Sequence, residues 1–470
     1  MVHLAVQISK YFIIFLYLIY TFQSFWVLRY PRNSEQPKAI YSSQRRIILY
    51  IQADAFLVLY LTSNNPQMIG LYLMQFVLFL SIFILYNLFF KEASRLLLNN
   101  MCMLMSTGLI ILTRLSFDKA YRQFVFMVAG LVLIMIFPAI IHGTKLFRSL
   151  TWLYAAVGIL SLALVTIAGQ TSYGAKLSLS FGGISIQPSE FVKIIFVFFL
   201  ASILYRAKSF RDILIASMGA GVFVLVLVAS KDLGSALLFF MTFLVMIYVS
   251  TKRFVFFGGG MLFMAVAFVL GYFAFSHVQA RVIAWQDPIA VIDSQGYQVA
   301  RSLFAIGTGG WLGLGINQGQ PGKIPVVEKD FVFSAICQEL GGVVAICIIL
   351  ICMSNFLMIF NISMQLKDRF YRLVALGLGT IYAMQVFLTI GGNIKFIPST
   401  GVTLALISYG GSSLLSTMIL FGIIQAMYLM QAKQDDLQKL KGRRGDGNGT
   451  EGTTKRTTKR TSGAKEIKCQ

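Results

Sequence analysis

Two carboxylates lie where a polar segment meets an apolar one, a place where a catalytic base could work. Asp330 ends a long polar segment, and Glu339 lies inside the apolar run that follows. Asp330 could cap a helix, which is the commonest role of an aspartate there. Glu339 must be paired or face a cavity, because an ionised side chain in an apolar span is costly. We therefore expect at least one of them to belong to a site.

A lysine lies one turn into another apolar run, in the segment Gln187-Pro-Ser-Glu190-Phe-Val-Lys193. Glu190 suits the positive end of a helix dipole, so capping explains it adequately. Lys193 needs a partner or water, because a buried ammonium is costly. An internal Glu190–Lys193 pair one helical turn apart is the structural alternative to a binding role.

Two more polar clusters interrupt the apolar sequence. The segment from Lys231 to Ser235 contains Asp232 and is most simply a turn with a solvated ion pair. The segment from Gly391 contains Lys395, and Ser408 follows within a run of small residues. Small residues allow helices to pack closely, but they also expose backbone amides to a phosphate or sugar. Both interpretations of the second cluster remain open.

The elements that carry these residues are predicted to be membrane-spanning helices. The chain has 470 residues, 57% hydrophobic and 12% charged, with a mean hydropathy of +0.75. Its apolar runs approach the ~20 residues that cross a bilayer as a helix and lack the alternation of barrel strands. The predicted spans are 11–28, 47–62, 68–90, 99–114, 123–142, 150–169, 190–205, 212–230, 233–250, 254–275, 331–361, 372–391 and 402–430. The fold class is an all-α polytopic membrane protein.

Charge sets the predicted orientation. More than half of the 40 lysines and arginines fall on one side if the C-terminus is cytoplasmic, as the positive-inside rule requires. An odd number of spans then places the N-terminus outside. The net charge of +22 is accounted for by these loops and by a basic tail over 433–470, predicted to be disordered, so nucleic-acid binding is not expected. Arg114, Lys119 and Arg122 fall on the outer side and should have a specific partner.

The largest outer loop spans about 276–330 and is rich in glycine and proline. Long loops on a rigid scaffold often carry binding sites, so function is expected to face outward. The five cysteines form no CxxC pair and the three histidines are scattered. We therefore predict no disulfide framework, no zinc site and no side-chain metal site.

The order of the motifs resembles the SEDS family, the FtsW, RodA and SpoVE group of bacterial peptidoglycan polymerases. The matching segments are Arg122-Gln123, Gly174 to Lys193, KDLGSA from Lys231, GYQ from Gly296, GTGGWLGLGINQG from Gly307, KIPVVEKDFVFSAICQELGG from Lys323 and IPSTGVTLALISYGGSSLL from Ile397. The resemblance implies a ten-helix membrane domain over 99–432. Residues 1–98 would then add about three N-terminal helices.

The resemblance also implies a reaction, the polymerisation of lipid II on the outer face of the bacterial cytoplasmic membrane. The loop aspartate of the family's HTDF-type motif falls on Asp330, which would be the general base. The substrate-binding candidates are Gln187, Glu190, Lys193, Arg122, Glu339, Gln298, Lys395 and Ser408. A divalent cation, Mg²⁺ or Mn²⁺, that bridges the pyrophosphate is consistent with this chemistry. The expected partner is a monofunctional class B penicillin-binding protein, in division, elongation or sporulation.

The sequence departs from the family at three motifs. The segment that often reads GARRW is Gly174-Ala-Lys-Leu-Ser178 here, HTDF is Glu328-Lys-Asp-Phe331, and the usual PLPF is Thr403-Leu-Ala405-Leu406. Ser178 cannot replace the tryptophan, so substrate contacts are affected more than the fold.

Two other functions remain as alternatives. A flippase or transporter for lipid-linked precursors would also carry intramembrane charges, although the charges here crowd one boundary and no inverted repeat is evident. A noncatalytic scaffold for a penicillin-binding protein would tolerate the altered motifs.

Overall fold

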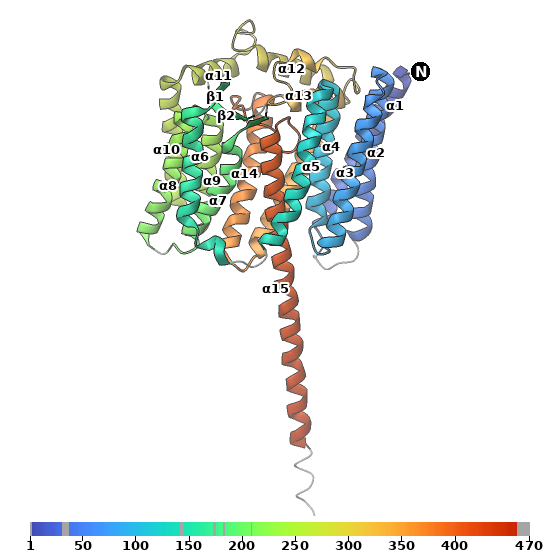
Figure 1. The fold of residues 1–470 in the computed structure, drawn as a ribbon. Helices are drawn as coiled ribbons and strands as arrows, with labels where there is room; N and C mark the ends of the chain where they lie inside the picture. Colours follow the sequence, from blue (N-terminus) through green and yellow to red (C-terminus); the bar gives the residue numbers. More distant parts are fainter. Residues whose placement is uncertain are drawn as a thin grey trace, which may run out of the picture.

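Most helices stand side by side as a bundle, and α11 and α12 lie across one end of it (Figure 1). The computed structural model describes residues 2–30, 37–141, 145–172, 175–181, 184–207 and 209–457, with only the backbone beyond residue 434. The helices are α1 (Val2–Val27), α2 (Pro37–Ser63), α3 (Gln67–Phe89), α4 (Arg95–Leu115), α5 (Phe117–Ile140), α6 (Thr151–Ala168), α7 (Pro188–Leu204), α8 (Phe210–Ala229), α9 (Leu233–Thr251), α10 (Phe254–Ala274), α11 (Ser276–Gln286), α12 (Tyr297–Gly309), α13 (Val332–Gln365), α14 (Arg369–Asn393) and α15 (Gly411–Thr457).

The predicted spans are confirmed as helices. In the described part of the chain, 12 helices are long and apolar enough to cross a membrane. The 17-residue α7 coincides with the remaining predicted span at 190–205. The protein is therefore an all-α multi-pass membrane protein. Its long stretch at 331–361 belongs to one element, α13 (Val332–Gln365), and not to two crossings, as the sequence predicted.

The two ends of the bundle differ. At one end, here called the loop face, lie α11, α12 and a small antiparallel sheet of β1 (Gln170–Ser172), β2 (Ala175–Phe181) and β3 (Ile184–Ile186), in the order β1-β2-β3. The N-terminus also lies at this end, and α15 leaves the bundle at the other end, the tail face (Figure 1). The predicted 276–330 loop is thus partly helical and caps the loop face.

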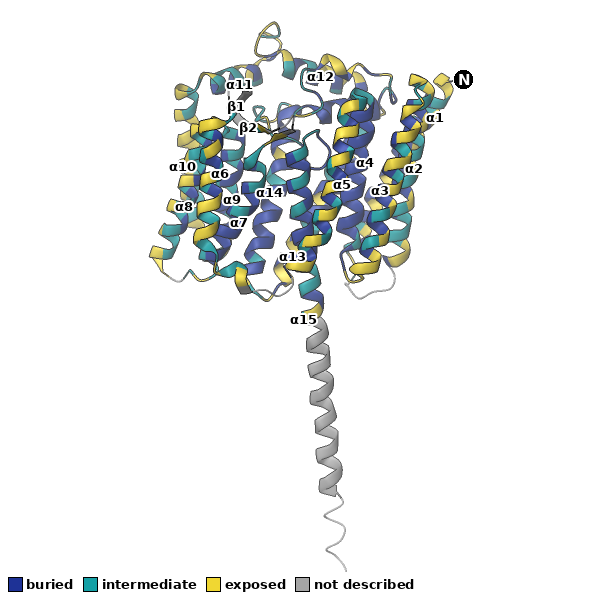
Figure 2. Ribbon diagram, in the orientation of Figure 1, coloured by how far each residue is buried: buried dark blue, intermediate teal, exposed yellow. Residues whose placement is uncertain are grey.

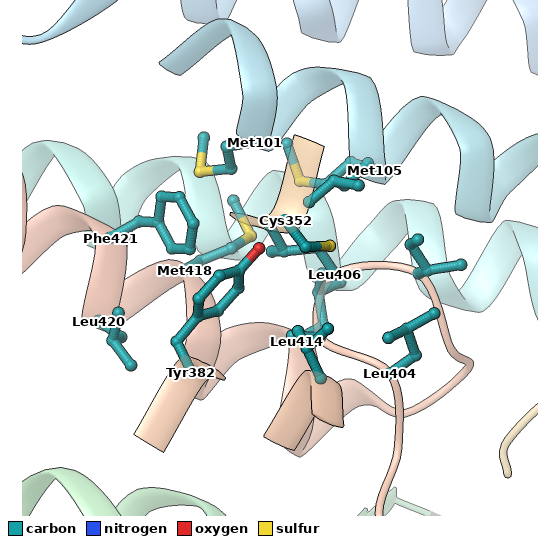
Figure 3. Close-up of a cluster of buried hydrophobic side chains, with 14 of the residues drawn as sticks. Met101, Met105, Cys352, Tyr382, Leu404, Leu406, Leu414, Met418, Leu420 and Phe421 are labelled. Atoms are coloured by element: carbon teal, nitrogen blue, oxygen red, sulfur yellow. The ribbon is translucent and has the colours of Figure 1, made fainter. Parts of the chain in front are cut away.

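Burial differs sharply between helices (Figure 2). Every residue in the apolar stretch of α4 is buried, whereas no residue in the apolar stretch of α10 is buried. Near the centre of the bundle, Met101 and Met105 of α4 face Cys352 of α13, Tyr382 of α14 and Met418 of α15 (Figure 3). The Tyr382 and Phe421 rings meet edge to face at 5.5 Å. This layer joins the helices that support the loop face.

The last predicted span begins too early. Residues 402–410 are irregular, and α15 starts at Gly411. Leu404 and Leu406 are buried although they are not helical, and Leu406 has a φ of 67°. Ser408 Oγ accepts a hydrogen bond from the Leu404 amide at 2.9 Å, and Gln123 donates to the Ser408 carbonyl at 3.1 Å. Hydropathy predicted a helix here, but side-chain partners satisfy a non-helical backbone buried in protein.

Helix α13 is interrupted at Gly341, which has a φ of 90°. The interruption leaves backbone carbonyls before Gly341 and backbone amides after it without partners in the helix. The 307–315 segment forms hydrogen bonds with both sets. Gly315 donates to the Glu339 carbonyl at 2.9 Å, and Gly342 donates to the Gly310 carbonyl at 2.9 Å. A Cβ at Gly341 would lie 2.4 Å from the Gly313 nitrogen, so the backbones can approach this closely only because both residues are glycines.

Helices α1–α3 pack against α4, α5 and α13 and share the core of the bundle. They are here called the N-terminal module, and their contact with α4 is called the seam. Tyr17 and Thr107 hydroxyls meet at 2.6 Å, and Tyr20 donates to Asn100 Oδ1 at 3.0 Å. Lys10 reaches across to the Gly313 carbonyl at 3.3 Å. The module is thus fixed to the core by polar contacts between spans.

The C-terminal end differs from its prediction. The backbone of α15 stays helical through Thr457, past residue 433 where disorder was predicted. The stretch from Gln434 to Lys441 is rich in Gln, Leu and Lys, which are good helix formers and extend the helix.

Candidate active site at the loop face

A cavity of about 1150 Å³ opens among α5, α7, α9, α11, α12 and the 399–413 segment. Its lining contains five cationic and three acidic side chains. They are Arg122, Lys193, Lys231, Arg281, Lys329, Glu190, Asp232 and Asp330. The cationic excess favours an anionic ligand, because opposite charges attract strongly where water is partly excluded.

The start of α7 forms one wall of the cavity. Pro188 begins the helix, and Glu190 lies in its first turn. Lys193 is buried and donates to Glu190 Oε2 at 2.5 Å and to Gln385 Oε1 of α14 at 2.9 Å. Lys193 therefore has the internal partner that the structural alternative predicted, and it also lines the cavity. An ammonium has three N–H groups, so one remains for a ligand.

Asp330 also lines the cavity, beside Arg281 of α11. A Cβ at Gly401 would lie 3.5 Å from Arg281 Nη2 and 3.9 Å from Asp330 Oδ2. Gly401 has a φ of 73°, and the absence of a side chain leaves room beside these two groups. The geometry therefore keeps a carboxylate and a guanidinium next to open space.

The backbone of Asp330 is held from below by α14. Asn393 donates to the Asp330 carbonyl at 2.7 Å and accepts from Ser334 at 3.0 Å. Ser302 of α12 lies 2.5 Å from the Ser334 hydroxyl. This network fixes Asp330 while leaving its carboxylate to the cavity. Asp330 is not the side-chain cap of α13.

Burial raises the pKa of the Asp330 carboxyl above its ordinary value, although Arg281 and Lys329 oppose the rise. The nearby Glu328 adds to it. A raised pKa makes the ionised carboxylate a better proton acceptor, as a general base requires. Burial likewise raises the pKa of Asp232.

Asp232 differs from its prediction as half of a solvated ion pair. Its carboxylate caps α9 by accepting from the Ser235 amide at 3.1 Å. The other oxygen accepts from Ser189 at 3.2 Å, which ties α9 to the start of α7. Arg281 interacts electrostatically with Asp232 and Asp330 together.

The structure brings most of the predicted site residues together. Six of them line the cavity: Arg122, Gln187, Glu190, Lys193, Gln298 and Asp330. Three others do not: Glu339, Lys395 and Ser408. Sequence reasoning did not select Arg281, Asp232 or Gln385. Burying the Lys193 ammonium without a polar partner would be costly, so a polar residue in another apolar span was to be expected beside it. Gln385 of α14 is that residue.

The three residues outside the lining have structural contacts. Glu339 pairs with Arg114 at 2.9 Å, beneath the 307–319 segment. Ser408 donates to the Lys329 carbonyl at 2.5 Å and so joins the 401–410 segment to the Asp330 loop. The Lys395 carbonyl accepts from the Trp285 indole at 3.1 Å. We assign no substrate contact to them.

Two of the three outer basic residues that the charge pattern singled out have acidic partners. Arg114 binds Glu339, and Lys119 pairs with Glu328 in the loop before α13. Arg122 lines the cavity instead. Two of these three cations therefore anchor the loop, and the third is available to a ligand.

The described part of the altered motifs lies around the same cavity, and Gly174 lies outside the described residues. Ser178 of β2 and Thr403 line it, and Thr403 meets the Ser413 hydroxyl at 2.8 Å. Ala405 is fully buried behind the lining. The small residue at Ser178 leaves that part of the cavity wall without an aromatic side chain.

The carboxylates do not form a metal site by themselves. No group of three or more metal-ligating side chains occurs among the described residues. Glu190 accepts from Lys193 and Ser416, and Asp232 from Ser189 and Ser235. Both oxygens of Asp232 and the Oε2 atom of Glu190 are thus engaged by the protein, and any cation would depend mainly on ligand oxygens.

The fold and the cavity define a polytopic membrane protein with a charged site at one face. Residues 87–433 match the model of the FtsW/RodA/SpoVE family, described as cell cycle protein. The chain belongs to this family. Helices α1–α3 lie almost wholly outside the matched range.

Named relatives and solved structures agree with this assignment. The chain is 36% identical over 278 residues to "Peptidoglycan glycosyltransferase RodA" of Mycobacterium tuberculosis, covering 56% of this chain and 59% of that protein. It thus spans about three fifths of that relative. It is 30% identical to the Mycobacterium leprae RodA, covering 70% and 76%. The Thermus thermophilus RodA crystal structure matches with a TM-score of 0.54 at 22% identity, covering 72% and 97%. The likeness to that structure supports the fold.

Proposed function

We propose that this protein is a peptidoglycan glycosyltransferase that polymerises lipid II into glycan strands. The observation that carries the proposal is the joint placement of Asp330, Arg281 and Lys193 on the wall of one cavity. These residues are far apart in the sequence and bring a base and two cations to one space. Relatives at 30–36% identity bear the name peptidoglycan glycosyltransferase, which supports the same reaction.

The proposed step is an inverting displacement. The 4-hydroxyl oxygen of one disaccharide attacks the anomeric carbon of another while Asp330 accepts the hydroxyl proton. The new carbon–oxygen bond forms as the bond to the lipid-linked pyrophosphate breaks, and the electron pair leaves with undecaprenyl pyrophosphate. A positioned base contributes about 10²- to 10⁴-fold to such a rate. Cations aimed at the leaving group stabilise the charge that develops there.

The cations have different positions in this scheme. Lys193 retains one N–H after donating to Glu190 and Gln385, so it suits a single phosphate oxygen. Arg281 lies beside Asp330 and would hold the base near the sugar end. Arg122 and Lys329 complete the positive lining. A Mg²⁺ or Mn²⁺ ion, held mainly by ligand oxygens, would neutralise charge on the pyrophosphate leaving group. The ion remains part of the proposal, and no step above depends on it.

The orientation and the partner also belong to the proposal. The loop face would lie outside the bacterial cytoplasmic membrane and the tail face inside, because most basic loop residues lie at the tail face. A class B penicillin-binding protein would use the new strands. One solved structure of similar fold, with a TM-score of 0.63 at 23% identity, is described by the words "Structural coordination of polymerization and crosslinking by a peptidoglycan synthase complex". Which such protein co-purifies with this chain would also distinguish division, elongation and sporulation.

The test is direct. Purified protein, alone and with a class B penicillin-binding protein, is given labelled lipid II, and the products are separated by length. We expect glycan strands from the parent and none above background from Asp330→Asn. Strands from both would refute the base role. Lipid translocation across liposomes without any strand would favour a flippase, and neither activity beside tight partner binding would favour a scaffold.

A further inference from the structure

A second cavity lies at the tail face, between the N-terminal module and the core. It measures about 480 Å³, and no residue of α11 or α12 lines it. Its lining is Pro37, Lys38, Tyr41, Arg45, Phe83, Asn87, Lys91, Glu92, Ala93, Arg95, Leu98, Asn99 and Tyr428. Four of these side chains are cationic and one is acidic. The reaction proposed at the loop face uses none of them.

Two arginines from different helices line this cavity, and both are half-buried. Arg95, the first residue of α4, donates to Asn87 Oδ1 at 2.8 Å and to the Lys91 carbonyl at 3.2 Å. The Arg45 guanidinium of α2 lies over the Phe83 ring at 5.9 Å. Among the described residues neither forms an ion pair with a carboxylate, although Glu92 lies within electrostatic range of Arg95. Two like charges that share a cavity are costly without an anion, and guanidinium groups match phosphate geometry well.

The surroundings point to a lipid rather than to a free anion. Leu88 and Phe89, which follow Asn87 at the end of α3, are 63% and 62% exposed. Polar side chains fix the cavity wall: Asn99 donates to the Tyr41 carbonyl at 3.2 Å and to Gln44 Oε1 at 3.0 Å. A charged cleft thus borders an apolar helix surface at the end of a span, where headgroups and acyl chains meet.

We propose that this cavity binds the phosphate of an anionic phospholipid, which fastens the N-terminal module to α4 and α15. The headgroup phosphate lies between Arg45 and Arg95, with Lys91 at the rim. The acyl chains lie along the exposed end of α3. The N-terminal module therefore completes a lipid site that the core alone lacks.

The experiment uses full-length protein in nanodiscs of phosphatidylcholine with or without phosphatidylglycerol. Native mass spectrometry measures retained lipid, and thermal unfolding measures stabilisation. We expect phosphatidylglycerol to remain bound to the parent and to raise its unfolding temperature. Arg45→Gln/Arg95→Gln should weaken retention at least tenfold. The control Arg211→Gln/Arg253→Gln removes the same charge from exposed positions at the tail face and should retain the lipid.

Three further measurements distinguish a bound lipid from free phosphate and check that the variants are folded. Arg45→Lys/Arg95→Lys keeps the charge and should retain more lipid than the glutamine variant. Glycan synthesis and elution volume verify that the glutamine variant is folded. Inorganic phosphate at constant ionic strength should not reproduce the stabilisation. Equal stabilisation by phosphate, or equal loss in the pocket and control variants, would overturn the proposal.

Discussion

The loop-face cavity and the α1–α4 seam are both rich in polar residues, but they use them differently. In the seam, Tyr17 meets Thr107, and Asn100 accepts from Tyr20 and Ser24, so each side chain is matched to a neighbouring helix. In the cavity, Asp330 and Arg281 face open space. A buried polar residue is therefore a sign of function only when its partners leave it available.

From this comparison we expect cavity substitutions to change activity and seam substitutions to change stability.

The largest effect should come from Asp330→Asn. It removes the proton acceptor while keeping shape and the Asn393 contact to the backbone, so the rate of glycan synthesis should fall by about 10²- to 10⁴-fold. The unfolding temperature should stay near that of the parent. A large fall in that temperature would place Asp330 among the structural residues.

Glu339→Ala should have nearly as large an effect, but on stability. It leaves Arg114 without its carboxylate partner beneath the 307–319 segment, and breaking a buried ion pair costs about 3–5 kcal/mol. Thermal unfolding in detergent measures the loss. Arg114→Ala alone and with Glu339→Ala completes a double-mutant cycle. A stable variant without activity would instead make Glu339 a member of the site.

Arg281→Gln should shift the pH dependence of the reaction. Arg281 opposes the burial that raises the pKa of Asp330, so its removal should raise that pKa further. Since the base must be ionised, activity is lost as pH falls through its pKa, and the acidic limb of kcat/KM should move to higher pH. Arg281→Lys, which keeps the charge, should move it less. If the acidic limb of kcat/KM stays at the same pH, Arg281 does not influence the pKa of the base.

The smallest effect is expected in the seam. Asn100→Ala removes contacts to α1 and to Ser354 of α13, and hydrogen bonds between membrane helices contribute about 0.6 kcal/mol on average. The unfolding temperature should drop slightly while kcat stays the same. A loss of activity beyond the loss of folded protein would show that the module communicates with the cavity.

The helices could be predicted closely because each span is a continuous apolar run with polar ends. Asp232 and Pro188 mark the starts of α9 and α7 as capping rules would place them. The exceptions are residues 402–410 and Gly341, where the backbone leaves the helix in an apolar context. There hydrogen bonds from Gln123 and the 310–315 segment decide the conformation, and sequence periodicity does not reveal them.

The sequence by itself predicted nearly all of the spans, the boundary at which polar side chains gather and Asp330 as the focus of the proposed site. Only the tertiary structure decided that Arg281 and Asp232 join it, that Glu339 does not, and that α4 is central while α10 is peripheral. Lipid is as apolar as a protein interior, so hydropathy identifies a span but not its neighbours. Pairing between distant polar side chains, such as Lys193 with Gln385, supplies that missing information.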